Sequence, residues 1–170
     1  IEFIGGEELE EKAIMNAPNI SMVLRESTGI QIQQTSLSSG NRSIRIQGLD
    51  GRYTQLLKDG FPLYGGFSGG LSIMQSPPLD LAQFEIIKGS SSTLYGGGAI
   101  AGLINMVSKT PDEEPALDIM LTQTQALGST ANVFYSKRNE KFGVSLYGSG
   151  HYQKAYDPED DDFSNLPKTT

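Results

Sequence analysis

The hydrophobic pattern begins with helical segments and then changes period. Residues 7–16 are rich in strong helix formers, carry acids in the first turn and precede Pro18, which predicts a short helix. A second helix is predicted from Ser21 to Arg25, ended by the turn Ser27-Thr28-Gly29. Helical patterning is then mostly finished, so we expect strands in the rest of the chain.

From Ile30 onward, apolar residues recur with a period of two in short runs. Such runs stand at residues 30–32, 44–46 and 55–58, and apolar strands are predicted at 84–88 and 103–107. Asp59-Gly60 suits a two-residue hairpin turn, but Pro62 follows at once and weakens a second strand. We therefore predict a strand end followed by a loop at this point.

Two glycine-rich segments interrupt the strands. Residues 64–78 contain four glycines and two prolines without a steady period, which predicts a long surface loop with Tyr64 and Phe67 at its tip. Residues 89–102 are expected to turn tightly. The aromatic residues Tyr64, Phe67 and Tyr95 either stack on a ligand or pack on their own loops, and both interpretations stay open.

Longer strands are predicted after Pro115. Apolar and polar residues alternate over 117–121, 133–135 and 142–152, and the last run approaches the ~9–11 residues of a transmembrane β-strand. The turn at residues 138–141 is short and polar, whereas the run at 157–162 is long and acidic. We expect tight turns at one end of these strands and loops at the other.

Composition excludes most familiar catalytic chemistry. The 170 residues include no cysteine and a single histidine, His151, so disulfides, thiolate metal sites, zinc clusters and histidine-based triads are ruled out. We interpret His151 as a structural or interfacial strand residue. With 13 basic and 20 acidic residues the net charge is −7, which argues against nucleic-acid binding. No apolar run is long enough for a transmembrane helix and no signal peptide is recognisable, so a soluble chain is expected. Because the sequence starts at Ile1 without a methionine and stops without a closing helix or strand, we expect both ends to be cut.

Two polar patterns suggest binding chemistry. Residues 96–101 fit the dinucleotide fingerprint with Asp118 about 20 residues later, but the strand before and the helix after it are missing, so nucleotide binding is not favoured. Asp157, Asp160 and Asp161 belong to an acidic run that offers oxygen ligands of the kind calcium prefers. An EF-hand is excluded because Asp162 occupies its glycine position. A solvated acidic loop and a weak calcium site both remain open.

Three ordered blocks between Leu24 and Pro111 carry a family resemblance. They are residues 43–48 followed by 55–62, then 84–89, then 94–96 with 99–109. In order and spacing these blocks resemble the plug domain of TonB-dependent outer-membrane receptors, and the segment after Pro115 resembles the first strands of that family's barrel. The resemblance implies an α+β fold, with a small mixed β-sheet, short helices and Gly-rich loops, followed by a few antiparallel strands. It places the plug domain at 1–111 and the truncated barrel, with its acidic extracellular loop, at 112–170.

The function implied by this resemblance is transport, not catalysis. Such a plug gates an active transporter in the outer membrane of a Gram-negative bacterium, here for a metal chelate such as a siderophore, haem or cobalamin. Its implied partners are TonB, through a Ton box not recognisable in this chain, the remainder of its own barrel, and a small-molecule ligand at Tyr64 and Phe67. No cofactor is implied except calcium, which the acidic loop of the cobalamin-receptor branch coordinates in a comparable place.

The resemblance also names residues that dock the plug to the barrel. Arg45, Glu85 and Lys88 are expected in this role. Gln47 stands where the family commonly has a docking arginine, so that role does not carry over to it. Lys58 stands where the family usually has an apolar residue.

The alternative function is that of a soluble β-rich module that binds a carbohydrate or a protein through its glycine-rich loops. In either case the strands within 117–152 have open edges and an apolar face. Such features recruit other chains, so we expect the isolated chain to self-associate.

Overall fold

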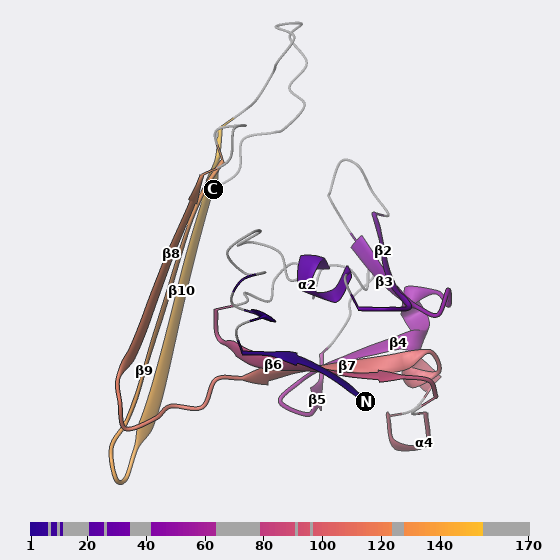
Figure 1. Ribbon diagram of the computed structural model, residues 1–170, viewed down its shortest axis with the longest axis horizontal. Coiled ribbons are helices and arrows are strands. Elements are labelled where there is room, and N and C mark those ends of the chain that lie inside the picture. Colours follow the sequence, from indigo (N-terminus) through magenta and orange to yellow (C-terminus); the bar gives the residue numbers. More distant parts are fainter. Residues whose placement is uncertain are drawn as a thin grey trace, which may run out of the picture. The chain divides into compact units, whose positions relative to one another are not determined.

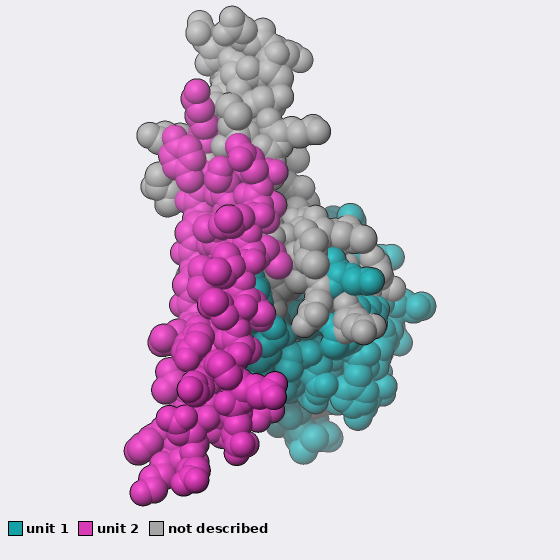
Figure 2. Space-filling view, turned by 60° about the vertical axis from the view of Figure 1, so that its left-hand side comes forward, with its two compact units in different colours: residues 1–109 teal, residues 110–170 magenta. Residues whose placement is uncertain are grey.

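The computed structural model describes residues 1–6, 8, 9, 11, 21–25, 27–34, 42–63, 79–90, 92–95, 97–123 and 128–154. These residues belong to two compact units, Ile1–Lys109 and Thr110–Thr170 (Figure 2). The division falls two residues before the boundary expected from the sequence. Most of the helix predicted at 7–16 lies outside the described residues, as do the whole loop 64–78 and the acidic run 157–162.

A five-stranded mixed sheet organises the first unit (Figure 1). Its strands, in spatial order, are β1 (Glu2–Gly5), β6 (Leu81–Lys88), β7 (Gly102–Ser108), β4 (Thr54–Lys58) and β5 (Phe61–Pro62). The pair β4 and β7 is parallel and the other pairs are antiparallel. A separate antiparallel hairpin consists of β2 (Ile30–Gln34) and β3 (Arg42–Ile46). The mixed sheet with short elements confirms the expected fold class.

The helices of the first unit are short. They are α2 (Ser21–Arg25), α4 (Ser92–Tyr95) and the 3₁₀ turns η1 (Gly51–Tyr53) and η2 (Gly97–Ala99). Helix α2 and the β2–β3 hairpin lie on one side of the sheet (Figure 1). Buried residues of α2, of the β2–β3 hairpin and of the sheet share one core, chiefly Val23, Leu24, Ile44, Ile46, Phe84, Ile86, Ile104 and Met106. Alternate residues of β6 and β7 therefore face this core, as a period of two requires.

The turn at Asp59-Gly60 corrects one prediction. It is a two-residue hairpin turn, because β5 pairs with β4 through Leu57 opposite Pro62 and Lys58 opposite Phe61. Both turn residues have positive φ, 51° and 80°, as a primed turn requires. Pro62 therefore does not prevent the second strand that the sequence pattern disfavoured. Because β5 is an edge strand, the missing N–H of its proline leaves no internal ladder bond unmade.

Four short elements were missed by the sequence-based prediction. Strand β1 adds to the edge of β6, η1 precedes β4, and the segment 89–102, expected to turn tightly, contains α4 and η2. Each spans only three or four residues, which is too short for a hydrophobic period to be read.

Lys58 has a specific partner in this fold. Its Nζ lies 2.6 Å from Oδ2 of Asp80, and both side chains are partly buried. The ion pair joins the end of β4 to the turn that leads into β6. A charged residue is therefore accommodated at a position where the family resemblance suggests an apolar one.

The second unit is a three-stranded antiparallel sheet in the order β10-β9-β8. Its strands are β8 (Ala116–Gln123), β9 (Gly128–Arg138) and β10 (Gly143–Gln153). Strand β9 extends well beyond the short run expected at 133–135, and the tight turn after Arg138 is confirmed by a hydrogen bond from Asn139 N to Phe142 O of 2.7 Å. None of the described helices is long and apolar enough to cross a bilayer.

Candidate functional site

One face of the three-stranded sheet is apolar and exposed. Its large side chains alternate along the strands and are between 41% and 77% exposed: Leu117, Ile119, Leu121, Val133, Val144, Leu146 and Tyr152. The register brings Ile119 opposite Val133 and Leu117 opposite Tyr135, so the patch runs across the strands. A contiguous apolar patch of this kind marks a surface that meets lipid or another protein.

The opposite face of the same sheet is mostly polar, although the buried Phe134 of β9 also belongs to it. Thr130, Asn132 and Ser136 of β9 are buried. Oδ1 of Asn132 accepts hydrogen bonds from the hydroxyls of Tyr147, at 2.9 Å, and Ser149, at 2.8 Å. Apolar residues on one face and hydrogen-bonded polar residues on the other are the pattern of a membrane barrel strand.

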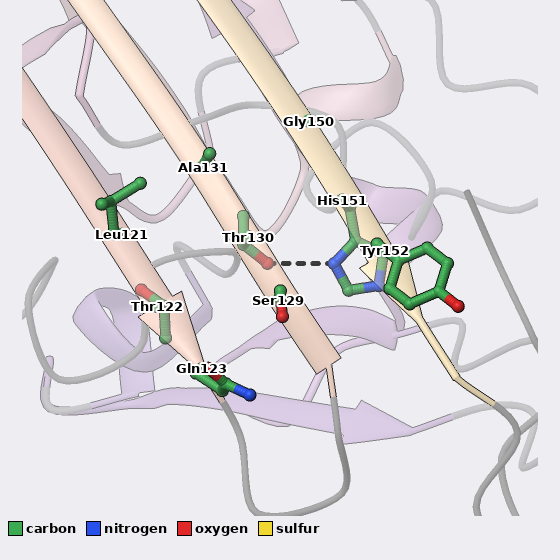
Figure 3. A pocket seen from close by; sticks show the side chains of 9 residues that line it. All are labelled: Leu121, Thr122, Gln123, Ser129, Thr130, Ala131, Gly150, His151 and Tyr152. Atoms are coloured by element: carbon green, nitrogen blue, oxygen red, sulfur yellow. Dashed lines mark hydrogen bonds between the residues drawn. The ribbon is translucent and has the colours of Figure 1, made fainter.

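A cavity of about 470 Å³ lies at one end of these strands (Figure 3). It is lined by Leu121, Thr122, Gln123, Ser129, Thr130, Ala131, Gly150, His151 and Tyr152. Nδ1 of His151 lies 2.9 Å from Oγ1 of Thr130 on the neighbouring strand (Figure 3). This cross-strand bond fits the structural role expected for His151. Within the described ranges, His, Cys, Asp and Glu nowhere gather in groups of three that are able to hold a metal ion.

The structure does not bring the three expected docking residues together. Arg45 lies on β3, in register with Gln31 of the hairpin. Glu85 and Lys88 belong to opposite faces of β6, and the ammonium of Lys88 binds the carboxylate of Glu2. The docking role of these residues therefore stays a prediction.

The other expected site residues lie outside the described residues. They are Tyr64 and Phe67 of the predicted apical loop and Asp157, Asp160 and Asp161 of the acidic run.

Glu2 links strand β1 to two distant segments of the plug unit, a role that the sequence pattern did not indicate. Its Oε1 accepts a hydrogen bond of 2.8 Å from the hydroxyl of Ser27, and its Oε2 binds Lys88. The hydrogen bond from Lys88, followed by that from Ser27, holds the pKa of this carboxyl below its usual value. Partners 25 and 86 residues away in the sequence leave no local signal, so only the fold reveals this cluster.

This lowered pKa predicts a pH-dependent stability. The carboxylate of Glu2 stabilises the folded state fully above the unfolded pKa of about 4.3, and the contribution is lost as the pH falls through the lower folded pKa. The variant Glu2→Gln should therefore be less stable than the wild type at pH 7, with the difference shrinking below about pH 4. Urea unfolding between pH 3 and 7 measures this, and Glu113→Gln at an exposed position is the control. A constant difference over this range would contradict the prediction.

Comparison with known protein families shows to which family this chain belongs. Residues 1–103, more than half of the sequence, match the family described as "TonB-dependent Receptor Plug Domain". The chain belongs to this family. The plug comprises the unit with the five-stranded sheet, and the family's name describes a receptor and not an enzyme, as expected.

Individual relatives agree with this assignment. The vitamin B12 transporter BtuB of Vibrio cholerae is 25% identical over 98% of this chain and 26% of its own length. Among solved structures, the siderophore receptor PirA of Acinetobacter baumannii has a TM-score of 0.69 at 22% identity, over 95% of this chain and 26% of that one. The ferric yersiniabactin uptake receptor FyuA of Yersinia pestis has a TM-score of 0.66 at 21% identity, over 89% and 23%. The plug chain thus spans about a quarter of the length of these relatives.

The structural likeness extends over both units of the plug chain. Coverage of 95% of the sequence includes the three-stranded sheet, which lies beyond the residues that match the plug family. The fold is therefore a plug followed by antiparallel strands that match the start of a receptor barrel. The glycine pattern at 96–101 leads into η2 and β7 and not into a helix, in keeping with its rejection as a nucleotide site.

Proposed function

We propose that this chain is the plug and the first barrel strands of a TonB-dependent transporter that imports a metal chelate, such as a siderophore, haem or cobalamin, across the outer membrane of a Gram-negative bacterium. The observation that carries the proposal is the succession, in one chain, of a plug-family unit and a sheet with one apolar exposed face and one polar face. The substrate class is supported by relatives named as a vitamin B12 transporter and siderophore receptors.

In this proposal the plug closes a barrel whose remaining strands belong to the same protein. Ligand binds from the extracellular side, and TonB, engaged through a Ton box, rearranges the plug to let the ligand pass. The short turn after Arg138 faces the periplasm and the acidic run faces outside, because barrels of this type have short periplasmic turns and longer extracellular loops.

The apolar face weighs against the alternative of a soluble binding module. Leu121 is 77% exposed, and Ile119 and Leu146 are each 61% exposed. A soluble domain rarely leaves so many large apolar residues of one sheet in water. In a barrel the same residues contact lipid.

Growth of a deletion strain tests the transport function. A strain lacking the full-length gene should fail to grow on one ferric siderophore, haem or cobalamin as sole source, and the restored gene should rescue growth only when TonB is present. Equal growth of the deletion and wild-type strains on all these sources would contradict the proposal.

Tyr64 and Phe67 are proposed to contact the ligand from the loop that follows the β4–β5 hairpin. Replacing both with alanine in the intact receptor should weaken binding of the imported chelate by about tenfold or more, because buried aromatic contacts dominate small-ligand sites. Titration of the purified receptor measures the affinity, and Tyr53→Ala, outside the loop, is the control. Unchanged affinity with a normal amount of receptor in the membrane would refute the role.

The acidic run is proposed to bind calcium in the intact receptor. Carboxylates close together repel one another, and a divalent ion relieves this repulsion. Calorimetry of the full receptor should show calcium binding that Asp160→Asn with Asp161→Asn reduces at least tenfold, whereas Glu113→Gln has no effect. Equal binding by the double variant would leave the run as a solvated acidic loop.

A further inference from the structure

The polar face of the three-stranded sheet ends in a row of uncharged side chains. The register aligns Thr122 of β8 with Thr130 of β9, and Thr130 with His151 of β10. Nδ1 of His151 lies 2.9 Å from Oγ1 of Thr130, and this bond fixes the imidazole beside β9 (Figure 3). These three residues, the uncharged row, therefore present two hydroxyls and an imidazole along one line across the strands.

Hydrogen-bonding groups without charge continue around this row. All three residues line the cavity of about 470 Å³, and its other polar lining residues are Gln123, Ser129 and Tyr152. Amides, hydroxyls and imidazole both donate and accept hydrogen bonds. Asp, Glu, Lys and Arg are absent from the described residues that line the cavity, and Lys154, which directly follows β10, is not part of the lining. A ligand at this end of the strands thus meets donors and acceptors but no carboxylate, ammonium or guanidinium group.

The two charged residues on the described part of the polar face lie far from the uncharged row. Asp118 is four residues before Thr122 on β8, and Arg138 is eight residues after Thr130 on β9. At about 3.3 Å per residue, these separations are about 13 Å and about 26 Å. Arg138 also has a partner, because its Nη2 lies 3.8 Å from Oδ1 of Asp112. Both charges are farther away than the Debye length of about 8 Å at physiological salt, so they are largely screened at the row.

The sequence that follows β10 adds negative charge. Residues 157–162 contain five acids and no base. In the proposed barrel this run faces outside, where a ligand enters. Calcium bound to the run would offset two of the five charges and leave three. Because a surface of one charge sign slows the approach of ligands of the same sign, an anionic chelate is disfavoured at the entrance, and the uncharged row offers it no cation.

We infer that this receptor takes a metal chelate without net negative charge and holds it at the uncharged row by hydrogen bonds. The inference rests on the proposed function, in which the polar face lines the lumen and the end at Gln123 is extracellular. Two kinds of chelate have this chemistry, a ferric trihydroxamate and a corrinoid, because their ligand groups balance the charge of the metal and their periphery bears amides. A triply anionic ferric catecholate is rejected, since taking an anion out of water without a cation to pair with it is unfavourable.

Binding of three probes to the purified full-length receptor tests the charge preference. The probes are vitamin B12 and ferrichrome, which carry no net charge, and ferric enterobactin, which is triply anionic. In titration calorimetry, one uncharged probe should bind about tenfold or more tightly than ferric enterobactin. The uncharged probe that binds identifies the source, corrinoid or hydroxamate. Equal or tighter binding of ferric enterobactin, or no binding of either uncharged probe, would overturn the inference.

A cation placed in the uncharged row should change this preference. Thr122→Arg should raise the affinity for ferric enterobactin about tenfold relative to that for the uncharged probe, because the guanidinium pairs with the anion. Thr122→Gln adds similar bulk without charge and should leave the ratio of the two affinities unchanged. A ratio that is the same in the wild type and in both variants would show that the chelate does not meet this row.

His151 should contribute directly to binding of the uncharged probe. His151→Ala should weaken binding about fivefold, as the loss of one hydrogen bond predicts, whereas His151→Gln keeps a donor and an acceptor and should retain most of the affinity. Glu113→Gln should bind like the wild type. Unchanged affinity in His151→Ala would overturn the role of the row. Growth that depends on the receptor with ferric enterobactin alone would refute the charge preference and leave the proposed function standing, whereas growth on every chelate without the receptor would refute the proposed function.

Discussion

Replacing Gly102 with alanine should destabilise the plug unit by about 3 kcal/mol or more, a large part of a domain's total stability. Gly102 has φ 150°, and a Cβ placed on it would lie 2.2 Å from the carbonyl oxygen of Ile87 and 3.2 Å from Cδ1 of Ile46. The carbonyl cannot retreat easily, because Gly102 begins β7 and is in register with both Lys88 and Thr54. Urea unfolding followed by circular dichroism measures the loss.

Gly148→Ala is the matched control for this prediction. Gly148 lies within β10, and a Cβ at this position would meet no atom within 4 Å. The control should change stability by less than about 1 kcal/mol. Similar effects of the two substitutions would show that backbone crowding at Gly102 is not decisive.

A charge on the apolar face of the three-stranded sheet should reduce insertion of the intact receptor into the membrane. Ile119 lies midway along β8, opposite Val133, and is 61% exposed. An arginine near the bilayer midplane of a barrel costs about 2–4 kcal/mol. We therefore expect Ile119→Arg to reduce the amount of full-length receptor recovered from the outer membrane severalfold.

Thr122→Arg on the polar face is the control for the membrane prediction. Thr122 belongs to the same strand and is in register with buried Thr130 on the face with the hydrogen-bonded polar residues. A charge on this face does not contact lipid, so receptor levels should stay close to those of the wild type. If both variants inserted equally well, the apolar face would not be the lipid surface.

Much of the fold follows from local pattern. The period of two at Ile44 and Ile46 and the apolar run ending at Lys88 correspond to β3 and β6, and the polar turn after Arg138 joins β9 to β10. These features were predictable because alternation reports which strand face is buried, whatever the rest of the chain does. The order of the sequence blocks likewise indicated the family that residues 1–103 match.

Short elements and their pairing were less predictable. Strand β1 and the two-residue β5 lack enough residues for a period, and they exist because an existing sheet edge offers them hydrogen bonds. Strand β9 was underestimated because its polar residues, such as Asn132, gain their partners from the strand beside them. In each case hydrogen bonds to a neighbouring strand stabilise a segment whose own residues have only a weak preference for strand structure.

The sequence by itself determined that this protein is a plug-like α+β unit followed by two-faced strands, and it singled out Glu85 and Lys88 as neighbours on one strand. Only the tertiary structure decided that these two residues act on opposite faces of the sheet. Lys88 forms an ion pair with Glu2, which lies 86 residues earlier in the sequence. Glu85 lines an apolar cavity and accepts hydrogen bonds from neutral amides. The reason is physical: the partners of a charge are fixed by chain segments that approach in space, and sequence distance carries no information about that approach.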